Sequence, residues 1–479
     1  MNVVTPSSET PQAIRDGLHG RALWLAMAVI LCGITICVLD STMLNLALPQ
    51  IARQFQISPA HTLWVVNANQ IASLVLLLPL AALGDRLGYK RVYLWGMLVF
   101  GLASVLAAFA NSLFWLLVAR ALQGMGMAGA LSVNSALVRQ IYPRSQLGRG
   151  MALNTMLVAL CVVMGPVLAA MVLSQLSWRW LFCLHLPLAL WVCWLGWRAL
   201  PVSSPSTLQG SQGQDWSWWD VLLNIGMFAA LFLALDRVSH YQLPSDGYWA
   251  LVWLCIGVAT GLLYVRRQRR LPQPMLPLDL LHIPVFRLSM CASICAFSAQ
   301  TMAFLALPFL LIEARGVSTA QAGLLISAWP AAMVIVAPWV GRQIGRIPAG
   351  RLGAVGMVLF ALGLGALALM PLDTTTWDMV WRMALCGTGF ALFQSPNNHT
   401  IVTAAPVHRS GAASGMLGTA RHVGQGVGAI CLAGAFVLSP AGAPGTAEQY
   451  ALWLAGSFAV VAAWFSGLRH APVAAKAQV

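Results

Sequence analysis

The chain has 479 residues, of which 59% are hydrophobic and only 8% are charged. About a quarter of the residues of an ordinary soluble domain are charged, so this composition excludes a water-soluble fold. The net charge of +14 would suggest nucleic-acid binding in a soluble protein, but here the basic residues lie between long apolar runs. We therefore expect a protein that lives in the lipid bilayer and binds no nucleic acid.

Continuous apolar runs recur along the whole chain. Each is about 18 to 25 residues long, enough for a helix to cross a hydrocarbon core about 30 Å thick. Because the runs are continuous and not alternating, they predict helices and exclude a β-barrel. The sequence thus predicts an all-α membrane protein with fourteen spans, which begin near Trp24, Leu63, Val92, Leu113, Gly150, Trp180, Val221, Tyr248, Leu288, Gln321, Leu352, Met379, Gly411 and Tyr450.

The spans fall into two blocks of six separated by a middle pair. Polar stretches bound this pair, and the one after it carries an arginine cluster followed by three prolines, which predicts a stiff connector. The first run lacks a cleavage pattern and is expected to remain as a helix. The predicted divisions are an N-terminal tail (1–23), a six-helix bundle (24–200), a linker with two additional transmembrane helices (201–287), a second six-helix bundle (288–468) and a C-terminal tail (469–479).

The distribution of the 27 lysines and arginines predicts the topology. With the N-terminus inside, most of them fall on inner segments, and an even number of spans returns the C-terminus to the same side. This asymmetry follows the positive-inside rule and places both termini in the cytoplasm. The few on the outer side are Arg53, Arg179, Arg237, Arg315 and Arg382.

The two blocks share a weak internal repeat. Fifteen residues separate Gly150 from Gly165 in the fifth span and Gly411 from Gly426 in the thirteenth. Likewise, LGDRLGYKR after the second span is echoed by VGRQIGRIP after the tenth, so that Gly84 and Gly88 match Gly341 and Gly345. Parallel repeats indicate two similar bundles with a substrate path between them; a general abundance of glycine in membrane helices is the alternative explanation.

Asp40 is the only acidic residue well inside a predicted span. A charge at the centre of a membrane helix costs about 2.5 to 3.5 kcal/mol on insertion scales. Burial favours the protonated form of a carboxyl group, which suits a site that alternates between a proton and a cationic substrate. Asp40 is therefore a candidate for proton coupling, and a permanent ion pair between the first and fourth spans is the alternative.

Three basic side chains also lie inside spans. Arg120 is expected in the outer half of the membrane, as Asp40 is, and can modulate Asp40 or bind an anion because it keeps its proton. Arg421 and His422 lie near mid-membrane, and adjacent helical residues point about 100° apart, so only one of them is expected to face the central cavity. His422 is a candidate proton relay, although a histidine bonded to a backbone carbonyl is commoner.

Polar amides in the apolar helices are candidates either for lining a cavity or for hydrogen bonds between helices. Sequence reasoning does not separate the two uses. The candidates for the cavity are Asn45, Asn69, Gln70, Gln123, Asn134, Gln300, Gln394, Asn397 and Asn398.

Two further motifs suggest moving parts. Gly165-Pro166 stands in mid-span, where proline removes a helix hydrogen bond and can act as a hinge. The loop LGDRLGYKR has glycines that permit a tight turn and close helix approach. Its candidate residues for a conformational latch between the bundles are Gly84, Asp85, Arg86, Gly88, Lys90 and Arg91.

These motifs resemble those of the major facilitator superfamily, and within it the fourteen-span drug:proton antiporters that include the quaternary ammonium exporters. LDSTMLNLALP from Leu39 is similar to the first-span motif of that subfamily, and LGDRLGYKR to the superfamily loop motif. ARALQGMG from Ala119 is similar to the fourth-span arginine motif, Gly165-Pro166 to the antiporter motif, and WRWLFCLHLP from Trp178 to the start of the sixth span. The chain departs from these patterns at Asn69, Ala81, Ala169, Ala170 and His185.

The resemblance implies a major facilitator fold and a monomeric antiporter in a bacterial inner membrane. It implies that Asp40 is functionally important, that Arg120 takes part in proton coupling and that Asp85 latches the bundles. Since no Walker-type phosphate loop, metal cluster or nucleophilic triad stands out, we expect no enzyme and no cofactor, with the proton gradient as the energy source.

The expected partners are protons and a small lipophilic substrate. With one membrane carboxylate, exchange of a monocation for a proton moves no net charge, so we expect monocationic or neutral substrates in preference to dications. The alternatives are a proton-coupled exporter of an endogenous metabolite and, from another class, a receptor or scaffold that transports nothing.

Overall fold

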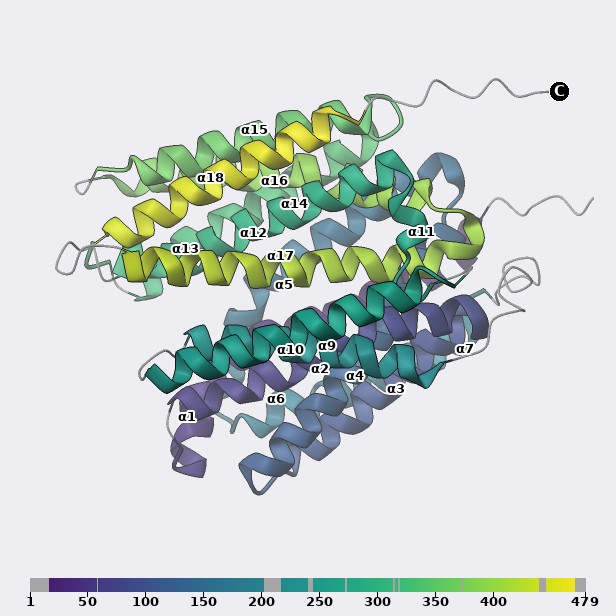
Figure 1. Cartoon of the computed structure of the whole chain (residues 1–479), viewed down its shortest axis with the longest axis horizontal. Coiled ribbons are helices and arrows are strands. Elements are labelled where there is room, and N and C mark those ends of the chain that lie inside the picture. Colours follow the sequence, from purple (N-terminus) through teal and green to yellow (C-terminus); the bar gives the residue numbers. More distant parts are fainter. Residues whose placement is uncertain are drawn as a thin grey trace, which may run out of the picture.

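The structure is a computed structural model, and it describes residues 17–57, 59–201, 217–239, 244–271, 274–312, 315–317, 319–371, 374–438 and 445–469. Its described part is helical, and the helices lie along one another in two bundles (Figure 1).

One bundle is built from the first part of the chain. Its helices are α1 (Gly20–Phe55), α2 (Pro59–Leu87), α3 (Tyr89–Ala108), α4 (Leu113–Ile141), α5 (Leu147–Leu173), α6 (Arg179–Cys183) and α7 (His185–Ala199), with a 3₁₀ turn, η1 (Arg144–Gln146), before α5. The middle segment forms α9 (Trp218–Ser239) and α10 (Pro244–Gln268), which pack on each other, and the short α11 (Leu278–Leu281).

The other bundle comes from the last part of the chain. Its helices are α12 (Pro284–Ile312), α13 (Thr319–Ile326), α14 (Ala328–Gln343), α15 (Ala349–Ala368), α16 (Thr376–Ala404), α17 (Ser410–Leu438) and α18 (Thr446–Gly467), with a 3₁₀ turn, η2 (Val407–Arg409), before α17.

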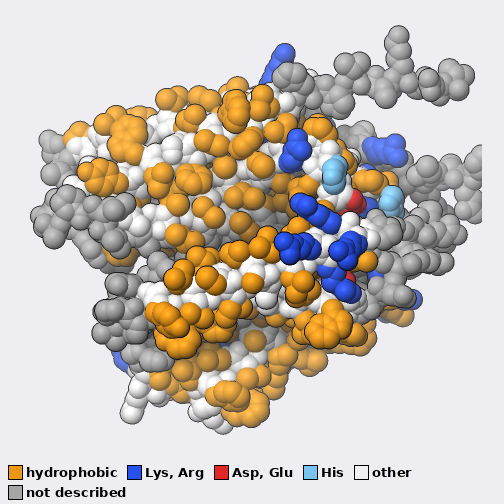
Figure 2. All heavy atoms as spheres, in the orientation of Figure 1, with side chains coloured by type: hydrophobic (Ala, Val, Ile, Leu, Met, Phe, Trp, Pro, Cys, Tyr) orange, Lys and Arg blue, Asp and Glu red, His pale blue; other side chains and the backbone are white. Residues whose placement is uncertain are grey.

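The predicted helical membrane architecture is confirmed. Within the described residues, eleven helical segments are long and apolar enough to cross a membrane, with α6 and α7 forming one such segment. Helices α9, α16 and α17 stand at the three other predicted positions, so the total of fourteen spans stays a prediction. Apolar side chains cover much of the visible face, whereas lysines and arginines gather at one end, beside α11 (Figure 2). We call this the basic end.

Corresponding turns in the two bundles have the same backbone geometry. Gly88 joins α2 to α3 with φ = 94°, and Gly345 lies between α14 and α15 with φ = 90°. Glycine adopts this left-handed region without the steric cost that a Cβ atom brings. The predicted match of Gly88 to Gly345 therefore has a structural basis, and it supports the internal repeat.

Glycine contacts also bring matching helices together. In α3 a Cβ atom on Gly96 would lie 2.7 Å from the carbonyl oxygen of Gly126 in α4. In α15 a Cβ atom on Gly356 would lie 2.6 Å from the carbonyl oxygen of Gly389 in α16. Without a side chain at these positions the backbones approach closely, which increases van der Waals contact between helices in lipid.

The two bundles meet near the basic end. Helix α17 packs on α2 and α4, and α5 packs on α14. A Cβ atom on Gly415 of α17 would lie 2.6 Å from Cβ of Ala81, and one on Gly341 of α14 would lie 2.7 Å from Cβ of Ala152. The described structure is therefore closed between the bundles at this end.

Candidate functional site

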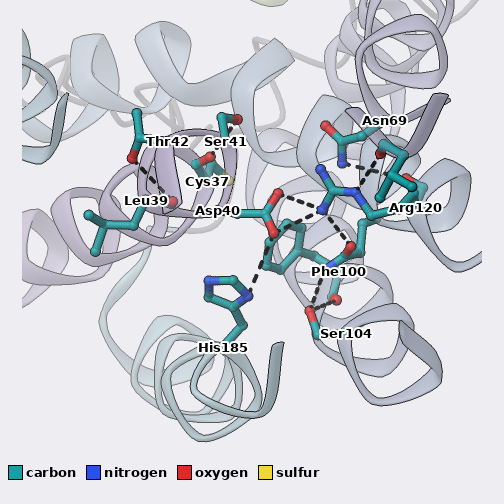
Figure 3. Close-up of polar contacts among 12 residues, drawn as sticks. Cys37, Leu39, Asp40, Ser41, Thr42, Asn69, Phe100, Ser104, Arg120 and His185 are labelled. Atoms are coloured by element: carbon teal, nitrogen blue, oxygen red, sulfur yellow. Dashed lines mark hydrogen bonds and ion pairs between the residues drawn. The ribbon is translucent and has the colours of Figure 1, made fainter. Parts of the chain in front are cut away.

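Asp40 and Arg120 form a buried ion pair between α1 and α4 (Figure 3). Each is only 1% exposed, and Nη1 of Arg120 lies 2.9 Å and 2.8 Å from the two carboxylate oxygens. Such a pair needs close geometry and further hydrogen bonds to offset the loss of hydration of both charges. The predicted proximity of these two residues is thus realised in this structure.

A polar network holds the guanidinium of Arg120 in place. Its Nε donates to the carbonyl oxygen of Val65 (3.0 Å), and Nη1 also donates to Oε1 of Gln123 (2.7 Å). Gln123 in turn donates to Ser104 (2.8 Å), and Asn69 donates to the carbonyl oxygen of Arg120 (3.4 Å). Gln123 and Asn69 are therefore part of the ion-pair site.

His185 completes this cluster from the start of α7. Its Nδ1 lies 3.7 Å from Oδ1 of Asp40, beyond hydrogen-bonding distance, and the residue is 4% exposed. Its ring meets the rings of Phe100 and Phe182 edge-on, and Nδ1 has no hydrogen-bond partner among the described residues. The predicted site residues did not include His185 or Ser104; the departure from the family pattern at His185 was the one available signal.

The two charges of this pair depend on each other. A proton on Asp40 would remove the negative charge that faces Arg120, and His185 stands close enough to approach the carboxyl group after a small movement. Arg120 would retain Val65 and Gln123 as partners. Loss of the charge on Asp40 would therefore leave a neutral acid beside a buried cation that keeps two hydrogen bonds, and it would change the relative stability of conformations that hold α1 and α4 differently.

Arg421 and His422 have different surroundings, as expected for adjacent residues. Nδ1 of His422 lies 2.9 Å from the carbonyl oxygen of Gly418, one turn back in α17. The guanidinium carbon of Arg421 lies 5.2 Å from the centre of the Phe297 ring in α12. The histidine has the backbone bond that was named as the commoner arrangement, and neither residue joins the Asp40 cluster within the described contacts.

The other amides differ in their surroundings. Asn397 bonds between helices: it donates to Ser293 (2.7 Å) and accepts from Arg469 (2.6 Å). Arg469, the first residue of the predicted tail, is buried in the second bundle, and burial lowers the pKa of its guanidinium to about 10. Gln394 is buried and its Oε1 has no partner in the described structure. Of the remainder, Gln70 is exposed, Asn134 is buried, Gln300 and Asn398 are half-buried, and the side chain of Asn45 lies outside the described residues.

Asp85 joins the two bundles at the basic end. Its carboxylate accepts the backbone N–H groups of Gly411 (2.8 Å) and Ala412 (3.0 Å), in the first turn of α17. A helix N-terminus carries unsatisfied N–H groups and partial positive charge, so it binds an anion well. Tyr89 also donates its hydroxyl to Asp85 (2.7 Å).

A second contact between the bundles runs from Arg139 of α4. Its Nη1 donates to the carbonyl oxygens of Val402 (2.6 Å) and Ala405 (2.8 Å) and to Oγ of Ser410 (3.0 Å). Sequence reasoning missed Arg139 and Tyr89; the position of Arg139 at the basic end of the fourth span was the only hint. Both residues reinforce the contact that Asp85 makes.

Lys90, Arg91 and Gly84 have other surroundings. Lys90 donates to the carbonyl oxygens of Trp197 (2.6 Å) and Leu200 (2.8 Å) within the first bundle, and Arg91 is exposed. Gly84 is tightly packed, since a Cβ atom there would lie 2.5 Å from Val133. The structure thus places Asp85 in the contact between bundles and Lys90 elsewhere.

At the predicted hinge, Gly165 lies against α1. A Cβ atom there would lie 2.0 Å from Oγ1 of Thr42. Helix α5 continues past this point to Leu173, and the side chain of Pro166 lies outside the described residues. The close approach explains the glycine, whereas hinge motion stays a prediction.

Residues 30–429 match the family model of the Major Facilitator Superfamily. The chain belongs to this superfamily. It is therefore a multi-pass membrane transporter that handles small molecules, and not an enzyme. Its fold resembles that of the proton:xylose symporter XylE, with a TM-score of 0.65 and 14% identity, covering 93% of this chain and 95% of that one.

Bacterial relatives include transporters named for different roles. The chain is 43% identical to the uncharacterized transporter YebQ of Escherichia coli (strain K12), over 96% of this chain and 98% of the relative. It is 30% identical to the multidrug resistance protein Stp of Mycobacterium tuberculosis (strain CDC 1551 / Oshkosh), over 83% and 72%. It is 25% identical to the riboflavin transporter RibZ of Clostridioides difficile (strain 630), over 85% and 86%. Bacterial relatives suggest the cytoplasmic membrane as its location.

Proposed function

We propose that this transporter is a fourteen-span, proton-coupled exporter of small lipophilic compounds, with both termini in the cytoplasm. The observation that carries the proposal is the buried Asp40–Arg120 pair. A carboxylate in the membrane interior is costly, and it can be stabilised either by this cation or by binding a proton. The similarity to a multidrug resistance protein supports lipophilic substrates.

The proposed cycle couples this pair to movement of the bundles. In the described conformation Asp85 and Arg139 close the basic end, which is the cytoplasmic end in the proposed topology. The central site then communicates with the outside, from which a proton reaches Asp40. Protonation weakens the α1–α4 pair and permits rearrangement to a state that opens toward the cytoplasm, where substrate enters and the proton leaves.

The pairing of Asp40 with Arg120 limits the charge of the substrate that this site can bind. Arg120 already neutralises Asp40 in this conformation, so a cationic substrate could bind the carboxylate only by displacing the guanidinium. A neutral compound needs no such displacement. The expected preference for a monocation therefore depends on a second conformation in which the pair is broken.

Export of an endogenous metabolite is the second candidate. The similarity to a riboflavin transporter favours it, because riboflavin is a metabolite. Amides such as Gln394, whose Oε1 has no partner in the described structure, could bind such a compound.

Efflux from energised vesicles tests the proposal. The probes are ethidium, rhodamine B and rhodamine B ethyl ester, each measured with and without a protonophore. We expect uncoupler-sensitive efflux of at least one probe in the wild type and its loss in Asp40→Asn. The control is Asp378→Asn, which alters another arginine-paired aspartate, 2.7 Å from Arg382 and far more exposed.

Two results would count against the proposal. Efflux that survives in Asp40→Asn would remove that carboxylate from coupling. The absence of efflux for all three probes would favour the dedicated metabolite exporter.

A further inference from the structure

Arg421 carries a charge that nothing in the described structure balances. Its guanidinium contacts the Phe297 ring at 5.2 Å, but no hydrogen bond or ion pair joins it to another described residue. Two other membrane arginines do have partners: Arg120 has Asp40, and Arg139 has three oxygen acceptors. Arginines within a membrane are costly and usually pair or face water, so an arginine without a paired carboxylate marks a place that water or a ligand can reach.

The contacts of α17 show which way Arg421 points. Gly411 and Gly415 lie against α2, whereas Gly424 and Gly428 lie against α12. Between these two directions stands Ser414, whose hydroxyl accepts the backbone N–H of Ser135 in α4 (3.2 Å).

Arg421 is seven residues beyond Ser414, so it lies on the same face of α17, about two turns farther from the basic end. That face is directed across the space between the bundles. The side chain is half-buried, and Gln425, one turn farther on, is exposed. Arg421 therefore stands where the closed contact between the bundles gives way to accessible space.

The described carboxylates of the surrounding helices are already engaged, and the side chain of Asp236 in α9 lies outside the described residues. Asp40 of α1 binds Arg120, Asp85 of α2 binds the start of α17, and Asp378 of α16 binds Arg382. Glu448 stands in the first turn of α18, at the end of the bundle opposite the basic end. Among the side chains that the structure describes, no carboxylate pairs with Arg421.

The remaining polar groups near this face are neutral amides. Gln425 stands one helical turn from Arg421, and the Phe297 ring connects Arg421 to Phe390 of α16, with ring centres 5.7 Å apart. Gln394, one turn from Phe390, is buried with Oε1 unpartnered. The planar guanidinium of Arg421, with the Gln425 amide one turn away and the Phe297 ring beside it, suits an anionic group on an apolar body, whereas the free Oε1 of Gln394 could only accept a hydrogen bond.

We propose that Arg421 binds an anionic group, such as a carboxylate, on the exported compound. This rests on the proposed export function and specifies its substrate class as lipophilic anions or zwitterions. It differs from the monocation expected from the sequence, because Asp40 is neutralised within the first bundle whereas Arg421 is not neutralised. The membrane potential, negative inside, would also drive an anion outward.

A matched pair of dyes tests the substrate class. Rhodamine B carries a carboxylate, which its ethyl ester lacks, while the ring system is the same. We expect Arg421→Gln to lower efflux of rhodamine B relative to the ester by about ten- to one-hundred-fold, the value of one or two charge-assisted hydrogen bonds. Arg421→Lys should restore part of this ratio, because it keeps the charge but loses the planar fork.

A second measurement does not depend on transport of either dye. A cysteine introduced by Gln425→Cys is labelled with a negatively charged and a positively charged methanethiosulfonate reagent, and rates are corrected for the native cysteines. Arg421→Gln should lower the ratio of negative to positive labelling by about ten-fold, since it removes a unit charge one turn away.

The outcomes separate the two proposals. If the wild type shows no uncoupler-sensitive efflux of any probe, the proposed export of lipophilic compounds is contradicted. The labelling ratio then decides by itself whether Arg421 makes the site positively charged. Uncoupler-sensitive efflux with equal losses of both rhodamines in Arg421→Gln, or a labelling ratio unchanged by that substitution, would overturn the anion site alone.

Discussion

The contact of Asp85 with α17 should set how often the cytoplasmic end opens. The carboxylate accepts two backbone N–H groups at 2.8 Å and 3.0 Å from a helix N-terminus. A hydrogen bond to a charged group contributes about 1.5 to 3 kcal/mol, and interaction with the helix terminus adds about 0.3 to 1 kcal/mol. Asp85→Asn keeps the size and one acceptor oxygen, so it should weaken the closed state by about 2 to 4 kcal/mol. At about 1.4 kcal/mol per ten-fold, the open fraction should rise about 30- to 1,000-fold.

Labelling of a buried position measures that fraction. Ser414 is 2% exposed at the contact between α17 and α4. When opening and closing are fast, Ser414→Cys reacts with a thiol reagent at a rate proportional to the open population. Asp85→Asn in this background should raise the rate by the factor above.

Two glycine substitutions serve as matched comparisons. Gly411→Ala should act in the same direction, because its Cβ atom would lie 2.4 Å from Oδ1 of Asp85. Gly434→Ala in the same helix should have no effect, since no atom lies within 4 Å of its Cβ position. An unchanged labelling rate in Asp85→Asn would refute the latch, whatever the effect on transport.

Two further outcomes follow from the ion pair and from the repeated turns. Arg120→Gln should destabilise the protein by about 3 to 5 kcal/mol because it leaves a buried carboxylate unpaired, and adding Asp40→Asn should recover much of this loss. Thermal unfolding in detergent measures both variants. A double variant as unstable as Arg120→Gln would argue against the pair. Gly88→Ala and Gly345→Ala should each cost about 1 to 2 kcal/mol, because φ is 94° and 90°. Gly456→Ala, in a helix with its nearest neighbour at 4.0 Å, is the control, and equal melting temperatures for all three variants would contradict the strain argument.

The sequence predicted the elements well for a simple reason. In lipid the backbone must satisfy its own hydrogen bonds, so a long apolar run has few alternatives to a helix. The predicted starts accordingly fall within or close to helices, although the helices extend farther; the fifth run was placed at Gly150, and α5 begins at Leu147. The number of spans and the division into blocks follow from the same periodicity and stay predictions.

The candidate site was only partly predictable. A carboxylate and an arginine within predicted spans attract attention because each is costly in lipid, and this reasoning found Asp40 and Arg120. The choice between a cavity amide and one that joins helices depends on what faces each side chain. Asn397 meets Ser293 and Arg469, whereas Gln394, three residues earlier, has an oxygen without a partner in the described structure.

The sequence by itself determined that this protein is a helical membrane transporter with one carboxylate deep in its spans, because hydropathy and charge cost depend on residue type. Only the tertiary structure decided which charges neutralise each other. Asp40 is 80 positions from Arg120 in the chain, and Asp85 is 326 from Gly411, yet both pairs are in contact. Arg421 has no such counter-charge in the described structure. Pairing depends on distance and direction in space, about which local sequence patterns carry no direct information. The pairing in turn determines which charge remains available to a substrate.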